Sequence, residues 1–152
     1  MDGQRGPLVV LEYPGGRGGG MNSKRYQEQV LEGVLKDFYN EMKAMRGRVI
    51  FQQDGALSHT SISTTTWFSR ENIPLLFHPP NSPDLNPIEP VWHELKKLIH
   101  ALPSPPSTIE QLRAAILEAW NALRVEDINK YVKSMSDRVE AVVKAKGGHT
   151  KY

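Results

Sequence analysis

Two carboxylates in this sequence each stand at the edge of an expected structural element. Asp54 directly follows residues 49–53, which begin with the apolar run Val49-Ile50-Phe51, and Glu89 opens an expected helix after a loop rich in proline and asparagine. Carboxylate oxygens are ligands that hard divalent cations prefer, and Mg²⁺ is usually held by one or two carboxylates together with a substrate phosphate. Asp54 and Glu89 are therefore candidate metal ligands for chemistry on a phosphate group.

Each carboxylate also has a purely structural interpretation. Asp54 precedes Gly55, and Asp-Gly is a strong turn signal. Asn86, Pro87 and Glu89 have the sequence form of a capping box, in which Asn86 caps the helix and Glu89 reaches back from its third position. The two interpretations of Glu89 are compatible, because a glutamate in the first turn of a helix can cap it and still face a neighbouring site.

Three short segments rich in β-branched or large apolar residues are predicted to be strands, at residues 8–12, 49–52 and 75–77. They alternate with predicted helices, and this order favours an α/β fold with some parallel strand pairing and helices over the sheet. Functional sites of such sheets gather beyond the carboxyl ends of the strands. Asp54 comes directly after the second predicted strand, so the fold class also favours a site there.

The helices are predicted from apolar periodicity and from their end signals. They are expected at residues 22–45, 58–70 and 87–99, after a capping box at 107–110, and at 126–144 with a break near 134–136. The first helix carries an apolar stripe that recurs every four residues, at Tyr26, Val30, Val34, Phe38 and Met42. Residues 79–84 are predicted to form an ordered loop, and residues 147–152 are predicted to be frayed.

The composition limits the class of protein more than it identifies one. A chain of 152 residues, 39% hydrophobic and 24% charged, suits a single globular domain. The formal net charge of +2 neither requires nor excludes a nucleic-acid partner, and the excess of lysine and arginine after residue 130 fits either phosphate contacts or a solvated tail. Cysteine is absent, which excludes disulfides and cysteine-based zinc sites. No apolar run approaches the roughly 20 residues of a membrane helix, so no membrane partner is expected.

Taken together, the motifs resemble those of the mariner-type transposases, a branch of the DDE superfamily. Residues 81–92 read Asn-Ser-Pro-Asp-Leu-Asn-Pro-Ile-Glu-Pro-Val-Trp, and they follow Asp54, His59 and the pair Pro79-Pro80 in the order and spacing of that family. The resemblance covers nearly the whole chain. It implies a ribonuclease-H-like domain, metal-dependent DNA strand cleavage and transfer with Mg²⁺ or Mn²⁺, and DNA as partner. It also implies pairing with a second copy or with full-length transposase, and a nuclear location.

The resemblance assigns roles to single residues. Asp54 matches the second catalytic acid of the family and Glu89 the third, so both are expected to bind metal. His59 matches a position where histidine is common, and it either supports the site or is structural. Asn86 is expected to belong to the scaffold that aims Glu89. Trp92 is expected to be a core residue, and His78 has no companion at metal-ligand spacing.

The sequence departs from the family pattern at the first catalytic aspartate. Asp2 and Asp37 are the aspartates before Asp54, and neither matches the motif. The resemblance thus implies a ribonuclease-H-like α/β domain without its first two strands, with residues 1–100 as a partial endonuclease domain and residues 101–152 as a C-terminal helical extension. We expect such a chain to be a truncated catalytic domain that is poorly active by itself.

Two other functions remain open at this level. The chain can be a non-catalytic module that binds DNA or pairs with full-length transposase. It can also be an unrelated α/β protein in which Asp54 and Glu89 serve only as turn and cap residues.

Overall fold

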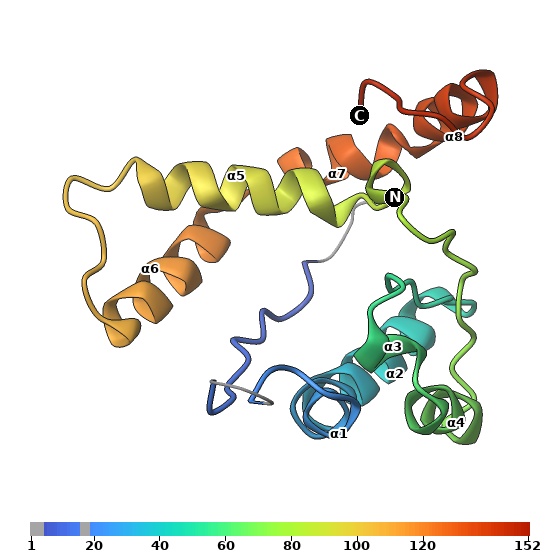
Figure 1. Ribbon diagram of the computed structural model, residues 1–152, viewed down its shortest axis with the longest axis horizontal. Coiled ribbons are helices and arrows are strands. Elements are labelled where there is room, and N and C mark those ends of the chain that lie inside the picture. The colour runs from blue at the N-terminus through green and yellow to red at the C-terminus, as the bar shows by residue number, and fades with distance from the viewer. Residues whose placement is uncertain (1–4, 16–18) are drawn as a thin grey trace. The chain divides into compact units, whose positions relative to one another are not determined.

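A computed structural model of the protein describes residues 5–15 and 19–152, whose regular structure is helical (Figure 1). These residues form two compact units. The first unit comprises the described part of residues 9–81, and the second comprises residues 5–8 with residues 82–152. Asp2 lies outside the described residues, and so do residues 16–18, which belong to a glycine-rich stretch at residues 14–20. The predicted division near residue 100 stays a prediction.

The first unit opens with one continuous helical segment made of α1 (Ser23–Tyr26), η1 (Gln27–Leu35) and α2 (Lys36–Arg46). Asn22 caps it, since its side-chain oxygen accepts a hydrogen bond from the Arg25 N–H at 2.9 Å. Gly47 ends it with φ of 76°, a left-handed conformation that glycine adopts without steric cost. The predicted helix over residues 22–45 is confirmed.

The buried face of this segment differs from the predicted stripe. The buried residues are Tyr26, Leu31, Leu35, Tyr39 and Met42. The middle part, η1, is a π-helix, in which hydrogen bonds span five residues, as in the bond from the Lys36 N–H to the Leu31 carbonyl. Each such turn holds more residues than an α-helical turn, so the buried stripe moves by one position after Tyr26. Val30, Val34 and Phe38 are only partly buried.

The helix predicted at residues 58–70 is in fact two helices, α3 (Leu57–Thr60) and α4 (Ile62–Arg70). Ser61 separates them with an extended backbone, and its Oγ accepts a hydrogen bond from the Thr64 N–H at 3.2 Å. A serine cap thus starts a new helix inside the predicted one. The core of the first unit consists of Tyr26, Leu31, Leu35, Tyr39, Trp67, Phe68 and Ile73.

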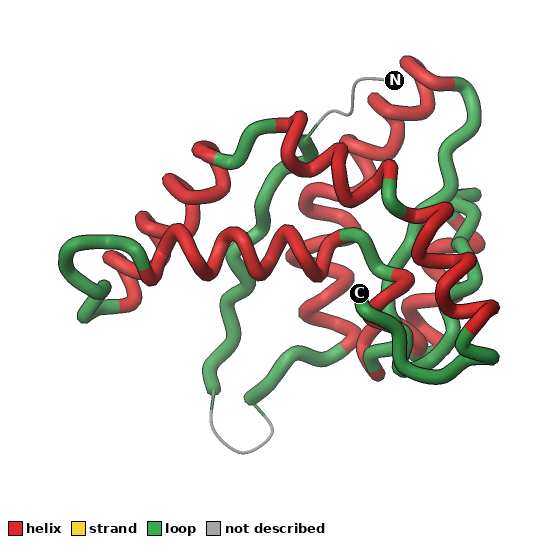
Figure 2. The backbone as a smooth tube through the Cα atoms, turned by 90° about the horizontal axis from the view of Figure 1, so that it is seen from above, coloured by secondary structure: helices red, strands yellow, loops and turns green. Residues whose placement is uncertain are grey.

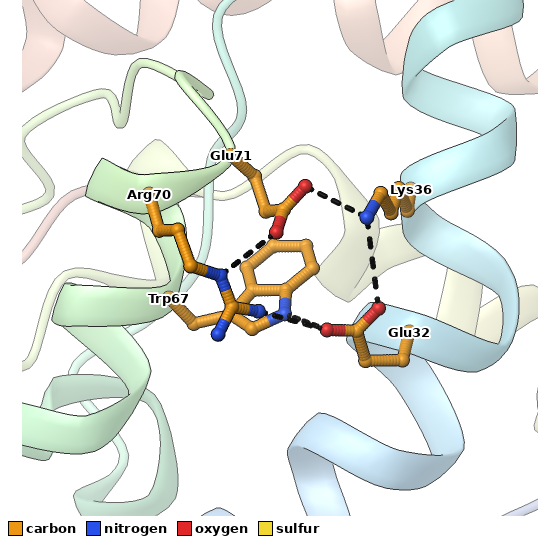
Figure 3. Close-up of polar contacts among 5 residues, drawn as sticks. All are labelled: Glu32, Lys36, Trp67, Arg70 and Glu71. Atoms are coloured by element: carbon orange, nitrogen blue, oxygen red, sulfur yellow. Dashed lines mark hydrogen bonds and ion pairs between the residues drawn. The ribbon is translucent and has the colours of Figure 1, made fainter.

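A polar network joins the long helical segment to α4 (Figure 3). The Trp67 indole and the Arg70 guanidinium both donate to Glu32 Oε1, the latter at 3.0 Å. Glu71 accepts from Lys36 Nζ at 2.8 Å and from Arg70 Nε at 3.0 Å. These hydrogen bonds lower the pKa of Glu71, and the bond from Lys36 has the largest effect. The network keeps the charged residues around the buried Trp67 paired.

The predicted α/β sheet is not confirmed. No strand forms within residues 5–15 and 19–152 (Figure 2). One parallel bridge in these ranges pairs Phe51 with Leu75. Phe51 donates its N–H to the Pro74 carbonyl at 2.9 Å and accepts from the Leu76 N–H at 2.8 Å. The second and third predicted strands therefore meet in the expected parallel sense, but only at this one position.

The first predicted strand, residues 8–12, has a different set of partners. The Glu12 N–H donates to Gln29 Oε1 at 2.8 Å, and Gln29 Nε2 donates to the Glu12 carbonyl. A strand needs the backbone of a neighbouring strand for its hydrogen bonds. At Glu12 the Gln29 side chain takes that place, and no strand forms at residues 8–12.

The second unit contains a short 3₁₀ turn and four helices: η2 (Pro83–Leu85), α5 (Ile88–His100), α6 (Ile109–Ala122), α7 (Val125–Lys133) and α8 (Met135–Lys144). The predicted break near residues 134–136 is confirmed at Ser134, which lies between α7 and α8. The capping box predicted for Ser107 and Glu110 is shifted by one residue. Thr108 accepts from the Gln111 N–H, and Gln111 Oε1 accepts from the Ser107 N–H.

The core of the second unit lies between α5 and α6. It consists of Val91, Leu95, Ala119, Trp120 and Leu123. Trp92 packs against it, with its ring centroid 5.8 Å from that of Trp120, so its assignment as a core residue is confirmed. Arg5 donates to the carbonyls of Trp120 and Leu123, both at 2.7 Å, and thereby places a cation at the negative end of α6.

None of the helices in the described ranges is long and apolar enough to cross a membrane.

Candidate functional site

Asp54 lies in the first unit, three residues after the bridge at Phe51. The preceding residue, Gln53, fixes this part of the chain on both sides. Its Oε1 accepts from the Tyr26 hydroxyl at 3.0 Å, and its Nε2 donates to the His59 carbonyl at 3.1 Å. The Asp54 side chain itself is about half exposed, at 52%. The contacts of the Gln53 side chain therefore hold the chain at Asp54 in place, while the Asp54 carboxylate remains accessible.

One oxygen of the Asp54 carboxylate is occupied and the other is not. Oδ1 accepts from the Ala56 N–H at 3.0 Å and from His59 Nδ1 at 2.6 Å. Partial burial opposes ionisation, but these two hydrogen bonds together with the electrostatic effects of His59 and His78 outweigh it and lower the pKa of Asp54. The carboxylate is thus ionised at neutral pH, and no hydrogen bond to Oδ2 forms within the described residues. The Ala56 contact also confirms the turn interpretation, which coexists with a ligand role.

His59 is held in one orientation. Since an ionised carboxylate can only accept, Nδ1 carries a proton and donates it to Asp54. The imidazole packs on the Tyr26 ring, with the centroids 4.3 Å apart. Burial, and then the negative charge of Asp54, raise the pKa of Tyr26, so its phenol stays neutral and keeps donating to Gln53.

His78 is a neighbour of this site that the sequence interpretation set aside. Its Nδ1 accepts from Gln52 Nε2 at 3.2 Å, and the ring lies close enough to Asp54 that a positive charge on it would lower the pKa of that carboxylate. The parallel bridge between Phe51 and Leu75 explains the placement, because residues that follow two parallel segments emerge at the same end. The signal was present in the sequence as a histidine directly after the third predicted strand.

Glu89 lies in the first turn of α5, in the second unit, and it does not cap that helix. Asn86 accepts from the Glu89 N–H through its carbonyl at 3.2 Å, and from the Ile88 N–H through Oδ1 at 3.4 Å. The capping box requires the Glu89 side chain to accept from the Asn86 N–H, but that N–H donates to the Pro83 carbonyl at 3.0 Å. The capping-box interpretation is therefore wrong, while Asn86 does hold the start of α5.

The Glu89 carboxylate is exposed and forms no hydrogen bond or ion pair with any residue that the structure describes. The structure thus brings Asp54 together with His59, and Asn86 together with Glu89. These two pairs belong to different units, and the convergence of Asp54 with Glu89 stays a prediction.

The residues present fit a hard divalent cation. Asp54 Oδ2 and both oxygens of Glu89 are accessible anionic donors, and oxygen ligands are those that Mg²⁺ and Mn²⁺ prefer. Over the described ranges, no cluster of three or more histidine and acidic side chains forms.

We expect Glu89→Ala and Glu89→Gln to have nearly equal free energies of unfolding, both within about 0.5–1 kcal/mol of the wild type. Each loses only the interaction of an exposed acid with the positive end of α5. A capping glutamate would instead make the glutamine variant the more stable of the two. Urea denaturation distinguishes the two cases. Asn86→Ala is the matched control, with an expected loss of about 0.5–2 kcal/mol.

Comparison with protein families matches residues 18–113 to the DDE superfamily endonuclease family. The Tc3 transposase of Caenorhabditis elegans is 36% identical over 132 residues, which cover 87% of this chain and 39% of the relative. The Tc1 transposase of the same organism is 39% identical over 103 residues, which cover 68% of this chain and 37% of the relative. The chain therefore spans about two fifths of the length of these relatives.

Solved structures of a mariner transposase are similar in fold. The catalytic domain of Mos1 mariner transposase matches with a TM-score of 0.73 at 27% identity, over 88% of this chain and 66% of that domain. The structure of the same domain with raltegravir and Mg matches with a TM-score of 0.72 at 27% identity, over 88% of this chain and 67% of that one. The structure of the Mos1 mariner paired-end complex with Mn matches with a TM-score of 0.69 at 25% identity, over 88% of this chain and 39% of that one. The fold is thus similar to that of a ribonuclease-H-like transposase catalytic domain.

Proposed function

The chain belongs to the DDE superfamily endonucleases, in their mariner-type transposase branch, and on that basis we propose that it supplies the second and third acids for metal-dependent DNA cleavage and strand transfer. The observation that carries the proposal is the Asp54 carboxylate. It is ionised and accessible, and it is held on Oδ1 by His59 and Ala56, so that Oδ2 remains for a metal ion.

In this function Asp54 and Glu89 would hold Mg²⁺ or Mn²⁺. Divalent ions bound between such acids and a phosphate supply activation of the attacking oxygen and stabilisation of the leaving one. His59 keeps the Asp54 carboxylate in a single orientation, and Asn86 keeps the first turn of α5 in place beneath Glu89. The His59 contact restricts the Asp54 carboxylate, and the Asn86 contacts restrict the backbone at Glu89, before substrate arrives, which reduces the free-energy cost of assembling the site.

The proposal requires Asp54 and Glu89 to approach each other. Since the chain has no cysteine, a double variant with Asp54→Cys and Glu89→Cys carries the only two thiols. A short bifunctional thiol reagent should join them within one molecule, as seen by the mobility of the denatured chain. The matched control pairs Asp54→Cys with Glu118→Cys, an exposed position on α6. Equal joining in both double variants would contradict the proposed site.

The proposal extends to the sheet. Residues 8–12, 49–52 and 75–77 would be strands of a ribonuclease-H-like α/β sheet whose other strands come from outside these 152 residues. The parallel bridge at Phe51 supports this, because it already has the hydrogen-bond pattern of a parallel pair. Residues 101–152 would then be the helical extension of that domain. A nuclear location, where DNA is the substrate, is part of the same proposal.

The exposed Lys96 on α5 is the observation behind a second candidate function, DNA binding without catalysis. Helical spacing places His93, Lys96 and His100 on the same side of α5 as Glu89, and all four are exposed. We expect Lys96→Ala to weaken binding to transposon-end DNA and to reduce the slope of log K against log salt by about 0.9, the value for one lost phosphate contact.

Fluorescence anisotropy over a series of salt concentrations measures this slope. The matched control is Lys43→Ala, which removes the same charge from an exposed position in the first unit. An identical loss in both variants would mean that only the net charge matters. DNA binding that depends on Lys96 in a chain without metal affinity would favour the non-catalytic module.

A further inference from the structure

Arg138 on α8 is a buried cation, 6% exposed, and it has no carboxylate partner within the described residues. Its Nε donates to Ser134 Oγ at 2.9 Å, and its Nη1 donates to the Asp84 carbonyl at 3.1 Å. Its guanidinium carbon stands 4.6 Å from the centroid of the Tyr152 ring. A buried charge is costly unless hydrogen bonds or a ring face compensate it. Arg138 therefore depends on the Asp84 carbonyl and on the Tyr152 ring.

The last residues of the sequence contact the same aspartate. Thr150 Oγ1 donates to Asp84 Oδ2 at 3.1 Å and accepts from the Tyr152 N–H at 3.3 Å. Asp84 is thus held through its carbonyl by Arg138 and through its carboxylate by Thr150, residues 54 and 66 positions away. The prediction that residues 147–152 are frayed is wrong for Thr150 and Tyr152. We call Asp84, Arg138, Thr150 and Tyr152 the tail latch.

The tail latch is connected to Glu89 by a short series of hydrogen bonds. Asp84 is the middle residue of η2, in which the Asn86 N–H donates to the Pro83 carbonyl. Asn86 in turn accepts from the N–H groups of Ile88 and Glu89. Asp84, Asn86 and Glu89 therefore lie on one braced turn, and holding Asp84 restricts where α5 begins.

We propose that the tail latch positions Glu89, with Thr150 and Arg138 acting as positioning residues for a metal ligand that they do not touch. The inference rests on the proposed function, in which Glu89 binds metal. It gives a role to residues 150–152, which lie outside the motif at residues 81–92. The latch fixes η2 against α8, so that the first turn of α5, which follows η2 directly, has one preferred position.

The test compares Thr150→Val with Thr150→Ser in the full chain. Valine has nearly the shape of threonine but no hydroxyl, whereas serine retains the donor to Asp84. Thr150→Val should speed hydrogen exchange of the Asn86 and Glu89 amides and leave the Leu95 amide, within α5, unchanged. It should weaken Mn²⁺ binding by on the order of tenfold, the lower end of the losses seen for groups that orient metal ligands. Thr150→Ser should keep both the amide exchange rates and the Mn²⁺ affinity of the wild type.

Two measurements decide the inference, with Mn²⁺ affinity followed by electron paramagnetic resonance. Unchanged exchange at Asn86 and Glu89 in Thr150→Val would overturn the latch. Faster exchange with unchanged Mn²⁺ affinity would overturn its positioning role. Glu89→Gln is measured in parallel, and if it binds Mn²⁺ as well as the wild type, the proposed function itself falls. A loss of affinity in Glu89→Gln without one in Thr150→Val would overturn only the latch inference.

Discussion

Asp54→Asn should reduce metal-dependent nicking of transposon-end DNA by at least about 100-fold in a catalytic domain that contains these 152 residues. Asparagine keeps the size of the side chain and an oxygen for the Ala56 N–H, but it removes the negative charge. Carboxylate charge is what holds a hard cation, and a displacement of reacting groups by about 1 Å can alone cost on the order of 100-fold.

The experiment joins the chain to the upstream segment that, in the mariner-type family, carries the first catalytic aspartate. Nicking of a labelled transposon end in Mg²⁺ or Mn²⁺ is measured for the joined protein, for its Asp54→Asn variant and for the 152 residues alone. We expect activity only in the first. His59→Ala should give an intermediate loss of about 10–100-fold, because it releases Asp54 without removing its charge.

Two outcomes would contradict this account. If the joined Asp54→Asn protein nicks at the rate of the parent, Asp54 is not a ligand, and its contact with Ala56 is only a turn contact. If the 152 residues alone nick DNA in a manner that depends on Asp54, another residue of this chain completes the site.

Phe68→Ala should destabilise the first unit by about 3–5 kcal/mol, the range for removing a buried phenylalanine. Phe68 is 2% exposed on α4. Its ring stacks on that of Phe51, with centroids 5.5 Å apart, and meets the Trp67 ring edge-on at 5.1 Å. Since Phe51 forms the parallel bridge just before Asp54, the lost packing also loosens the support of the site.

Ile62→Ala is the matched control, because Ile62 lies on the same helix but is 86% exposed. It should change the free energy of unfolding by no more than about 0.5 kcal/mol. Urea denaturation measures both. A loss of 3–5 kcal/mol can exceed the whole stability of a small unit, so Phe68→Leu provides a milder variant that keeps most of the apolar volume. Similar losses for Ile62→Ala and Phe68→Leu would contradict the burial pattern.

The sequence predicted those features that depend on residues close together in the chain. Asn22 and Gly47 mark the two ends of the first helical segment, and Ser134 marks the break between α7 and α8, as expected from cap and turn chemistry. Trp92, which was expected to be a core residue, packs against the core of the second unit. The family followed from motif order, with Asp54 and residues 81–92 as its main signals.

Predictions failed where another group of the chain took a hydrogen bond or where the helical geometry was not that of an α-helix. Glu89 has the spacing of a capping residue, but η2 uses the Asn86 N–H first. Residues 8–12 have the composition of a strand, yet the Gln29 side chain takes the hydrogen bonds of Glu12. The π-helical turns of η1 moved the buried stripe by one residue, because apolar periodicity assumes α-helical turns.

By itself the sequence determined which residues are candidates for chemistry, and it determined most of the helices, because both depend on side-chain type and short spacing. Only the tertiary structure decided how these candidates are supported. His59 contacts Asp54 from a position five residues later in the sequence. His78 lies near the same site because a parallel bridge joins the two segments. Arg138 and Thr150 contact Asp84 from positions more than fifty residues away. Such contacts form because buried charges and backbone groups need partners, and the fold, rather than sequence distance, determines which partner lies within reach.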